Sequence, residues 1–344
     1  MKLPIQPPLP VMEAELVDTI PEGASWRYEP KWDGFRCVAF RDGAEIELQS
    51  KAGQPLGRYF PDVVASLAAL GAKRFVIDGE IVIPVEGGLS FDALLQRIHP
   101  AESRVRKLAA ESPAQLVAFD MLVDTKGRSL LEEPLSARRE ALDAFAAAHF
   151  DDPHRLRVSP WTADVKTAEQ WLDMAGGALD GVVAKRSDLA YQGGERTGMQ
   201  KVKRARTVDC VVGGFRRGSR GQGVASLLLG LYDERGALDY VGFTSALTRE
   251  LRAEFARLLE PLCGPSAFTG RSPGGPSRWS RGKSTEWEPV RPEIVVEVAY
   301  DHMTSGRFRH GTRFLRLRPD KLPRQCTVEQ LQSGRGRTPL DIAA

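Results

Sequence analysis

The segment 29–36, EPKWDGFR, places Asp33, Gly34 and Arg36 at fixed offsets after Lys31. A lysine amine is a nucleophile only when it is neutral, which requires burial, cationic neighbours or a nearby metal ion. An isolated lysine is more often a solvated surface residue, so Lys31 by itself does not define a reactive site. Its meaning depends on the motifs that accompany it.

Four motifs with charged or aromatic residues follow Lys31 along the chain. Glu80 stands in the otherwise apolar run 75–83, where a carboxylate needs a partner or a function. Asp78 and Asp180 each precede a glycine, and either one in isolation would be a turn residue. Their occurrence in one order indicates a single site, formed by Asp78-Gly79-Glu80, Phe119-Asp120, the segment 180–185 (DGVVAK) and Lys201-Val202-Lys203.

The residue types in these motifs suit chemistry at a phosphate group. Magnesium prefers oxygen ligands and needs only one or two carboxylates when phosphates are near, so Glu80 and Asp180 are candidate metal ligands. Phosphoryl transfer concentrates negative charge on phosphate oxygens, and Lys201 and Lys203 are candidate cations to stabilise it. Lys31 would be the attacking group.

These motifs fall on a chain that alternates strand-like and helical runs from Trp26 to about Arg206. The expected strands are 37–40, 45–49, 75–83, 116–123 and 181–186, and the expected helices are 61–70, 136–148 and 168–175. From Thr207 the expected strands are 208–215, 226–232, 240–244 and 294–300, with one amphipathic helix at 249–259. The pattern predicts an α+β domain at 1–206 and a small β-barrel at 207–344, with a loosely packed tail after Pro323.

The ordered motifs resemble those of the covalent nucleotidyltransferase superfamily, in which the lysine of a KxDGxR motif is the nucleophile. Within it, the chain is most similar to compact two-domain bacterial ATP-dependent DNA ligases, including the ligase module of bacterial end-joining proteins. The likeness extends from about Pro10 to Lys321. It implies a nucleotidyltransferase domain followed by an OB-fold domain. It also implies a lysyl-AMP intermediate, transfer of AMP to a DNA 5′-phosphate, and displacement of AMP by the adjacent 3′-hydroxyl.

The resemblance further implies roles for individual residues. Arg36 and Glu80 contact the ribose, Phe119 stacks on the adenine, and Lys185 and Arg196 reach the AMP phosphate or its neighbours. Without the other motifs, Phe119 would be ordinary core packing and the two cations would be solvated. The implied catalytic set is Lys31, Asp33, Lys201 and Lys203, and the implied nucleotide-binding set is Glu29, Lys31, Arg36, Glu80, Phe119, Lys185, Arg196, Lys201, Lys203, Arg318 and Lys321.

Two positions depart from the usual ligase pattern. Asp180 replaces a glutamate at the start of the fourth motif, and its shorter side chain suits a metal held through water. Lys51, in the segment SKAG at 50–53, replaces an arginine, which keeps the charge but loses the bidentate fork toward a phosphate. We therefore expect the metal geometry at Asp180 and the DNA contact at Lys51 to differ from those of the family.

Basic residues gather at the domain junction and again near the C-terminus. Such clusters bind nucleic-acid phosphates with a salt-dependent affinity, although either one alone could be an ordinary charged surface. By resemblance, Arg318 and Lys321 of the segment RPDK orient the pyrophosphate leaving group. The first cluster is Arg204, Arg206, Arg216, Arg217 and Arg220, and the second is Arg307, Arg309, Arg313, Arg316, Arg318 and Lys321.

The composition is that of a folded protein, with 42% hydrophobic and 27% charged residues and a net charge of only +3. The four cysteines have neither disulfide-framework nor zinc-ligand spacing. A proline-broken N-terminus and the lack of a long apolar stretch predict neither a signal peptide nor a membrane span. We expect a cytoplasmic monomer that uses ATP with Mg²⁺, or Mn²⁺ in its place. Its substrate would be nicked or broken duplex DNA, in repair or recombination with other repair proteins.

Two other functions are compatible with the sequence. The lysine motif is shared with RNA ligases and with capping enzymes that use GTP, and single residues decide the base. A non-catalytic nucleic-acid-binding protein could also use an OB-fold and basic stripes. The residues before Lys31 and the segment 202–204 favour a DNA ligase, while the intact set Lys31, Glu80, Lys201 and Lys203 favours an enzyme.

Overall fold

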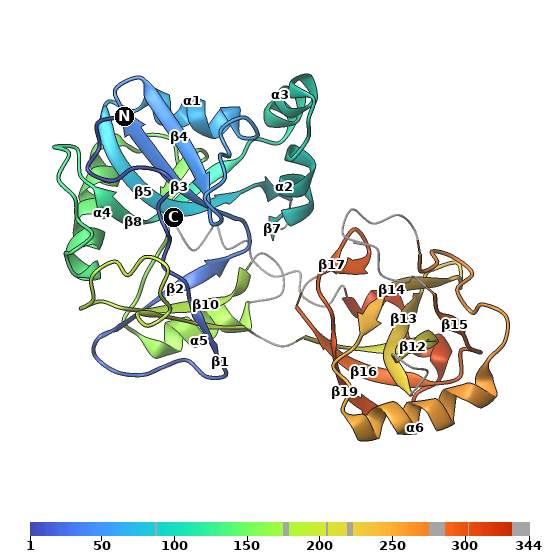
Figure 1. The fold of residues 1–344 in the computed structure, drawn as a ribbon. Coiled ribbons are helices and arrows are strands. Elements are labelled where there is room, and N and C mark those ends of the chain that lie inside the picture. Colours follow the sequence, from blue (N-terminus) through green and yellow to red (C-terminus); the bar gives the residue numbers. More distant parts are fainter. Residues whose placement is uncertain are drawn as a thin grey trace. The chain divides into compact units, whose positions relative to one another are not determined.

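The computed structural model describes residues 1–86, 88–174, 179–203, 206–218, 223–274, 286–301 and 303–331. These residues form two compact units, 1–203 and 206–331 (Figure 1). Among them, each hydrophobic cluster draws its members from one unit only. Each unit therefore has its own core.

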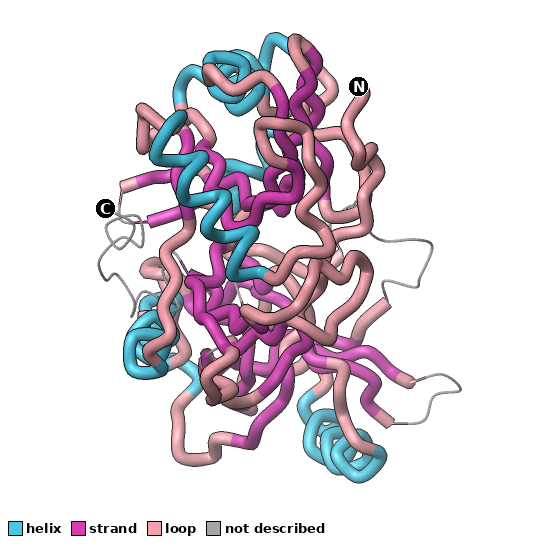
Figure 2. Tube along the Cα trace, turned by 90° about the vertical axis from the view of Figure 1, so that its left-hand side faces the viewer, coloured by secondary structure: helices cyan, strands magenta, loops and turns pink. Residues whose placement is uncertain are grey.

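A five-stranded sheet forms the centre of the N-terminal unit. Its order is β4 (Glu45–Ser50), β3 (Phe35–Asp42), β5 (Arg74–Val82), β8 (Gln115–Val123) and β9 (Leu156–Val158). Successive side chains of a strand point to opposite faces, so each strand contributes to two environments. On one face, Phe75, Ile77 and Ile81 pack against helices α1 (Pro61–Ala69) and α4 (Leu135–His149). Figure 2 shows α4 lying across the strands on the outside of the unit.

A second sheet of the same unit has the order β1 (Glu15–Val17), β11 (Met199–Val202), β10 (Leu179–Arg186) and β2 (Trp26–Trp32). Helix α5 (Val165–Asp173) covers one face, where Tyr28, Trp32 and Trp171 are buried together. The other face of this sheet meets the helix-free face of the five-stranded sheet, because Lys185 of β10 contacts Phe119 of β8. The space between the two sheets is thus lined by alternate residues of both.

Short elements complete the N-terminal unit at its edge. They are the hairpin of β6 (Pro84–Val85) and β7 (Gly88–Leu89), followed by helices α2 (Phe91–Arg97) and α3 (Glu102–Glu111). Buried Arg97 of α2 forms an ion pair with Asp62 of α1, which anchors these helices to the core. Neither helix was among the expected elements, because α2 is short and α3 is polar at most positions.

The C-terminal unit is an antiparallel barrel with the order β14 (Leu238–Thr244), β13 (Val224–Tyr232), β12 (Arg206–Arg217), β16 (Val295–Tyr300) and β19 (Arg313–Leu317), with β15 (Glu288–Pro289) also paired to β12. Thr244 at the end of β14 bonds through its hydroxyl to the carbonyl of Thr312 at 2.8 Å, which joins the two edges. Helix α6 (Arg249–Leu259) inserts Phe255 and Leu259 into the core. A small hairpin, β17 (Met303–Thr304) with β18 (Arg307–Phe308), precedes β19.

The expectation of a loosely packed tail after Pro323 is wrong for residues 323–331. This segment forms two 3₁₀ turns, η3 (Pro323–Gln325) and η4 (Val328–Leu331), and Val328 and Leu331 pack on the barrel core. Cys326, which lies between the two turns, is fully buried, and its carbonyl accepts a hydrogen bond from the Tyr232 amide at 2.8 Å. A few apolar side chains suffice to dock a polar segment. Residues 332–344 lie outside the described part of the chain.

The four cysteines are free thiols, three of them buried and Cys263 exposed. Among the described residues, no helix has the length and apolarity that crossing a bilayer requires.

Candidate active site

Lys31 lies near the end of β2, opposite Gly181 of β10 in the antiparallel register. The neighbouring Trp32 and the preceding Tyr28 are buried under α5, so strand alternation directs Lys31 to the face between the two sheets. Its side chain keeps 24% of its exposure. The predicted nucleophile is therefore partly buried yet reachable by a ligand.

Asp180 brings two of the predicted lysines together. One of its carboxylate oxygens lies 2.5 Å from Nζ of Lys31 and 2.8 Å from Nζ of Lys203. Gly181 makes this arrangement possible: its φ of +136° suits glycine, and a Cβ there would lie 2.0 Å from the Val202 carbonyl oxygen. The glycine of the fourth motif thus lets β10 approach the end of β11, directly before Lys203.

Charge at this cluster controls the protonation of the predicted nucleophile. Burial favours a neutral Lys31, but the carboxylates of Asp180 and Glu80 outweigh it and raise the pKa of the ammonium. Burial raises the pKa of Glu80 to about 7, opposed by the nearby Lys31 and Arg36. For Lys201, burial followed by repulsion from Lys31 and Lys203 lowers the pKa. Without a ligand, Lys31 is a paired ammonium and not yet a nucleophile.

The side chain of Arg36 is held in the space between the two sheets by a carboxylate. Its guanidinium forms two parallel hydrogen bonds with the fully buried carboxylate of Asp78, both at 2.6 Å, and Tyr191 donates its hydroxyl proton to the same carboxylate at 2.7 Å. The guanidinium carbon also lies 4.6 Å from the centre of the Phe119 ring. A bidentate pair of this kind holds the Arg36 side chain in one orientation.

Phe119 is flanked by a second cation. Nζ of Lys185 lies 4.2 Å from the centre of its ring and 2.8 Å from a carboxylate oxygen of Glu29. Glu29 is 3% exposed, and Arg139 of α4 lies 3.7 Å from the same carboxylate oxygen. The structure thus brings together Glu29, Lys31, Arg36, Glu80, Phe119, Asp180, Lys185 and Lys203 from the two facing sheets.

Arg196 lies at the surface and is engaged by an acid that the sequence did not single out. The Glu13 carboxylate lies 2.9 Å from Nη2 of Arg196 and 3.3 Å from Nζ of Lys51, and both cations are well exposed. Hydrogen bonds from Arg196 and Lys51 lower the pKa of Glu13. Arg196 and Lys51 also contribute to the lowered pKa of Lys201, so these cations belong to one electrostatic neighbourhood.

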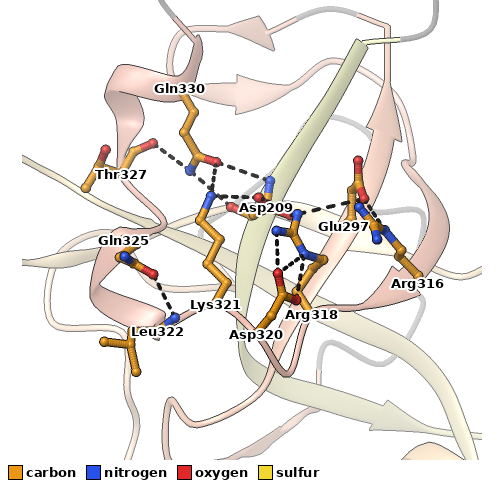
Figure 3. Close-up of polar contacts among 10 residues, drawn as sticks. All are labelled: Asp209, Glu297, Arg316, Arg318, Asp320, Lys321, Leu322, Gln325, Thr327 and Gln330. Carbon is orange, nitrogen blue, oxygen red and sulfur yellow. Dashed lines mark hydrogen bonds and ion pairs between the residues drawn. The ribbon is translucent and has the colours of Figure 1, made fainter.

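Arg318 and Lys321 lie in the C-terminal unit and share one acid, Asp209 of β12 (Figure 3). Asp320 contacts Arg318 from its other side at 2.9 Å. Hydrogen bonding from Arg318 lowers the pKa of Asp320 to about 2.

The residues around Lys31 fit a magnesium ion held with the help of a nucleotide. The described residues contain no group of three metal-type side chains, so a site built from protein alone is not formed among them. Two carboxylates, Glu80 and Asp180, flank the predicted nucleophile, and Mg²⁺ needs no more when phosphates supply further oxygens. The donor set is therefore of the right chemistry.

Four residues of these networks escaped the sequence reasoning: Glu13, Arg139, Tyr191 and Asp209. For Asp209 a signal was present, because an acid in the apolar run 208–215 poses the same question as Glu80 in 75–83. Tyr191 and Arg139 carry no local pattern, since their partners are distant in the chain.

An α+β unit with a candidate site between two sheets, followed along the chain by a separate barrel, is the architecture of a two-domain nucleotidyltransferase. The model for the "ATP dependent DNA ligase domain" family matches residues 11–203, and the "ATP dependent DNA ligase C terminal region" model matches residues 220–321. The chain belongs to the ATP-dependent DNA ligase family and is a DNA ligase of that class.

Known relatives agree with this assignment. "DNA ligase C" of Mycobacterium tuberculosis is 45% identical over 96% of both chains. The "Multifunctional non-homologous end joining protein LigD" of Mycolicibacterium smegmatis is 32% identical over 88% of this chain but only 37% of its own length. A solved structure titled as a Lig E DNA ligase, 18% identical, superposes with a TM-score of 0.52 over 90% of this chain and 99% of that one, which supports the fold.

Proposed function

We propose that Lys31 is the residue that takes AMP from ATP and passes it to the 5′-phosphate end of nicked or broken DNA. The observation that carries the proposal is the placement of Lys31 between the two sheets, 2.5 Å from Asp180, which also binds Lys203. The family supplies ATP as the nucleotide and DNA as the substrate. The pairing of Lys31 with Asp180 and its partial exposure support this role.

In the first step, Nζ of Lys31 forms a bond to the α-phosphorus of ATP, and the bond from that phosphorus to the bridging oxygen breaks. Pyrophosphate leaves with the electron pair. Before the attack, Lys31 must give up the proton that Asp180 and Glu80 stabilise, and this proton would pass to the solvent that the partly exposed side chain reaches. Lys201 and Lys203 would balance the charge that develops on the phosphate oxygens, since both lie near Lys31.

Glu80 and Asp180 are the side chains that would hold Mg²⁺, or Mn²⁺ in its place. When bound, the ion would neutralise their charge and so weaken the hold of these carboxylates on the Lys31 proton. The shorter Asp180 is already paired with two lysines, which fits a ligand that reaches a metal through water.

The remaining nucleotide contacts are proposed from position. Phe119 would stack on the adenine, Arg36 and Glu80 would reach the ribose, and Lys185 and Glu29 border the same space. Arg196 would act at the outer edge, released from Glu13 by a phosphate. Asp33 lies two residues beyond Lys31 and would help to set its charge.

We further propose that residues 1–206 are the nucleotidyltransferase domain and 207–344 the OB-fold domain with the C-terminal segment. The enzyme would act as a cytoplasmic monomer in DNA repair or recombination, with repair proteins as partners. The support is the relatives' names, which include end-joining proteins. Arg318 and Lys321 would orient the pyrophosphate that leaves in the first step.

The test is retention of label on denatured protein after incubation with α-labelled ATP and Mg²⁺. Protein first stripped of bound AMP with pyrophosphate should take up label, Lys31→Ala should take up none, and Lys107→Ala, an exposed lysine of α3, should behave as wild type. Lys31→Ala should still bind nicked DNA. Label on Lys31→Ala, or none on wild type, would overturn the proposal, and uptake from GTP in place of ATP would favour a capping-type enzyme.

A further inference from the structure

Asp209 is an acid near the start of β12, where it faces Glu297 of β16 in the register of the barrel. Its side chain is 11% exposed. The carboxylate binds Nη1 of Arg318 at 2.9 Å through one oxygen and Nζ of Lys321 at 2.7 Å through the other (Figure 3). One nearly buried carboxylate thus holds both basic residues of the RPDK segment.

A frame of hydrogen bonds fixes this arrangement. The Gln330 side chain donates to the Asp209 carbonyl at 3.2 Å, accepts from the Asp209 amide at 3.4 Å, and accepts from Lys321 Nζ at 3.2 Å. The Asp320 carboxylate accepts hydrogen bonds from Nε and Nη2 of Arg318 at 3.0 and 2.9 Å. Both cations are therefore held on two sides by groups from different parts of the chain.

Two cations so close to each other would repel without a shared anion. The carboxylate of Asp209 offsets that repulsion, while Arg318 and Lys321 keep 19% and 20% of their exposure and so remain reachable by a ligand. Paired donors on a rigid frame bind the oxygens of a phosphate group better than two mobile side chains, because less side-chain entropy is lost.

We propose that Asp209 is a positioning residue for the adenylylation step, which holds Arg318 and Lys321 at the spacing that receives the pyrophosphate of ATP. The inference rests on the proposed function, in which these two cations act on pyrophosphate. Pyrophosphate takes part only in the formation and reversal of lysyl-AMP. Loss of Asp209 should therefore slow that step and spare the later joining step, in which no pyrophosphate is present.

The alternative is that Asp209 has a structural role only. Asp209 also connects β12 to the segment 318–330, so its loss could loosen the whole barrel. A loosened barrel would impair every step that uses this unit, including the grip on DNA. Comparing two steps in one variant therefore separates the two roles.

The experiment uses the full chain with Asp209→Asn, which keeps the shape of the side chain and removes its charge. Label uptake from ATP should fall about tenfold or more, and the KM for pyrophosphate in release of ATP from lysyl-AMP should rise. Sealing of a nicked duplex already carrying a 5′-adenylate should stay within about twofold of wild type. Asp239→Asn is the matched control, an acid of the same unit whose partner is Arg271.

An equal loss in both steps, or unchanged label uptake, would overturn the inference. If Asp209→Asn lowers Tm so far that both steps fail, Asp209→Glu decides, because it keeps the charge but moves the oxygens by one methylene. Slower uptake with intact sealing in that variant supports positioning, and wild-type behaviour in both steps contradicts it. If wild-type protein takes up no label, the proposed function itself is wrong. Equal label on wild type and on the Asp209 variant would instead contradict only the role of Asp209.

Discussion

Three carboxylates in this structure each hold two of the cationic side chains that we place near a phosphate. Asp180 binds Lys31 and Lys203, Glu13 binds Arg196 and Lys51, and Asp209 binds Arg318 and Lys321. Two neighbouring cations without a shared anion would repel each other, so an acid is required to hold them together when no anionic ligand is bound. A phosphate group offers the same kind of acceptor. We therefore expect substrate binding to replace one anion by another at these cations.

Glu80 gives a pH-dependent test of this electrostatic reading. Because burial raises its pKa to about 7 from 4.5, the native state keeps the proton in a range where the unfolded chain has lost it. Wild-type stability should therefore fall as pH rises through that window. Glu80→Gln, which cannot ionise, should have a higher Tm than wild type at about pH 8 and the same Tm at about pH 4.

The same Glu80→Gln protein should lose most of its label uptake from ATP, because it lacks the proposed metal and ribose ligand. Stability gained and activity lost together are expected where an acid is kept for function. Thermal unfolding at both pH values and label uptake check the prediction. A Tm below that of wild type at about pH 8 would show that the charged form is stabilised by its neighbours instead.

Glu13 permits a test at the outer edge of the site. Glu13→Gln should tighten binding of nicked DNA about two- to fivefold, since Arg196 and Lys51 lose a competing anion. The salt dependence of binding should become steeper. Fluorescence anisotropy at several salt concentrations measures both. Glu102→Gln, an exposed acid paired with Arg106 on α3, is the control, and equal tightening there would reduce the effect to net charge.

At the scale of elements, two facing sheets create the site by strand alternation. On β5 the odd residues Phe75 and Ile77 enter the core under the helices, while Asp78 and Glu80 point the other way. On β2 the same alternation buries Tyr28 and exposes Lys31. A polar site can therefore sit between two apolar layers without breaking either core.

Gly181 is where this arrangement depends most on the backbone. Gly181→Ala should destabilise the protein by about 3 kcal/mol or more, because a Cβ would add a clash with Val202 to an unfavourable φ. It should also displace Asp180 from Lys203 and lower label uptake. Gly43→Ala is the matched control: its φ is +65° but its Cβ would meet nothing within 4 Å, so a cost of about 1–2 kcal/mol is expected. Equal losses would mean that only φ matters.

The sequence predicted most elements and the motif residues, and it failed where partners are remote. The expected strands at 37–40, 45–49 and 116–123 lie within β3, β4 and β8, because alternating and continuous apolar runs are local signals. The pairing of Tyr191 with Asp78 is not local, since it links residues far apart in the chain. The tail prediction failed for the same reason: docking of Cys326 depends on a barrel surface built from other segments.

At the scale of the molecule, the residues of the proposed chemistry are divided between two units with separate cores. The predicted nucleophile and its acids belong to residues 1–203, while Arg318 and Lys321 belong to 206–331. A reaction that needs both must bring the units together, yet each can fold around its own hydrophobic clusters. Because of this division, the contribution of each unit to the transfer of AMP from ATP to Lys31 can be measured separately.

A fragment of residues 1–206 should unfold in one cooperative transition, because its clusters contain no residue of the barrel among those described. Its Lys31 site should be intact, but label uptake from ATP should be slower than in the full chain by about a hundredfold or more, since Arg318 and Lys321 are missing. The full chain with Arg318→Ala and Lys321→Ala should show a slowdown of similar size. Uptake by the fragment at the full-length rate would mean that the barrel serves DNA binding alone. A much slower fragment than the double variant would assign further catalytic groups to the barrel.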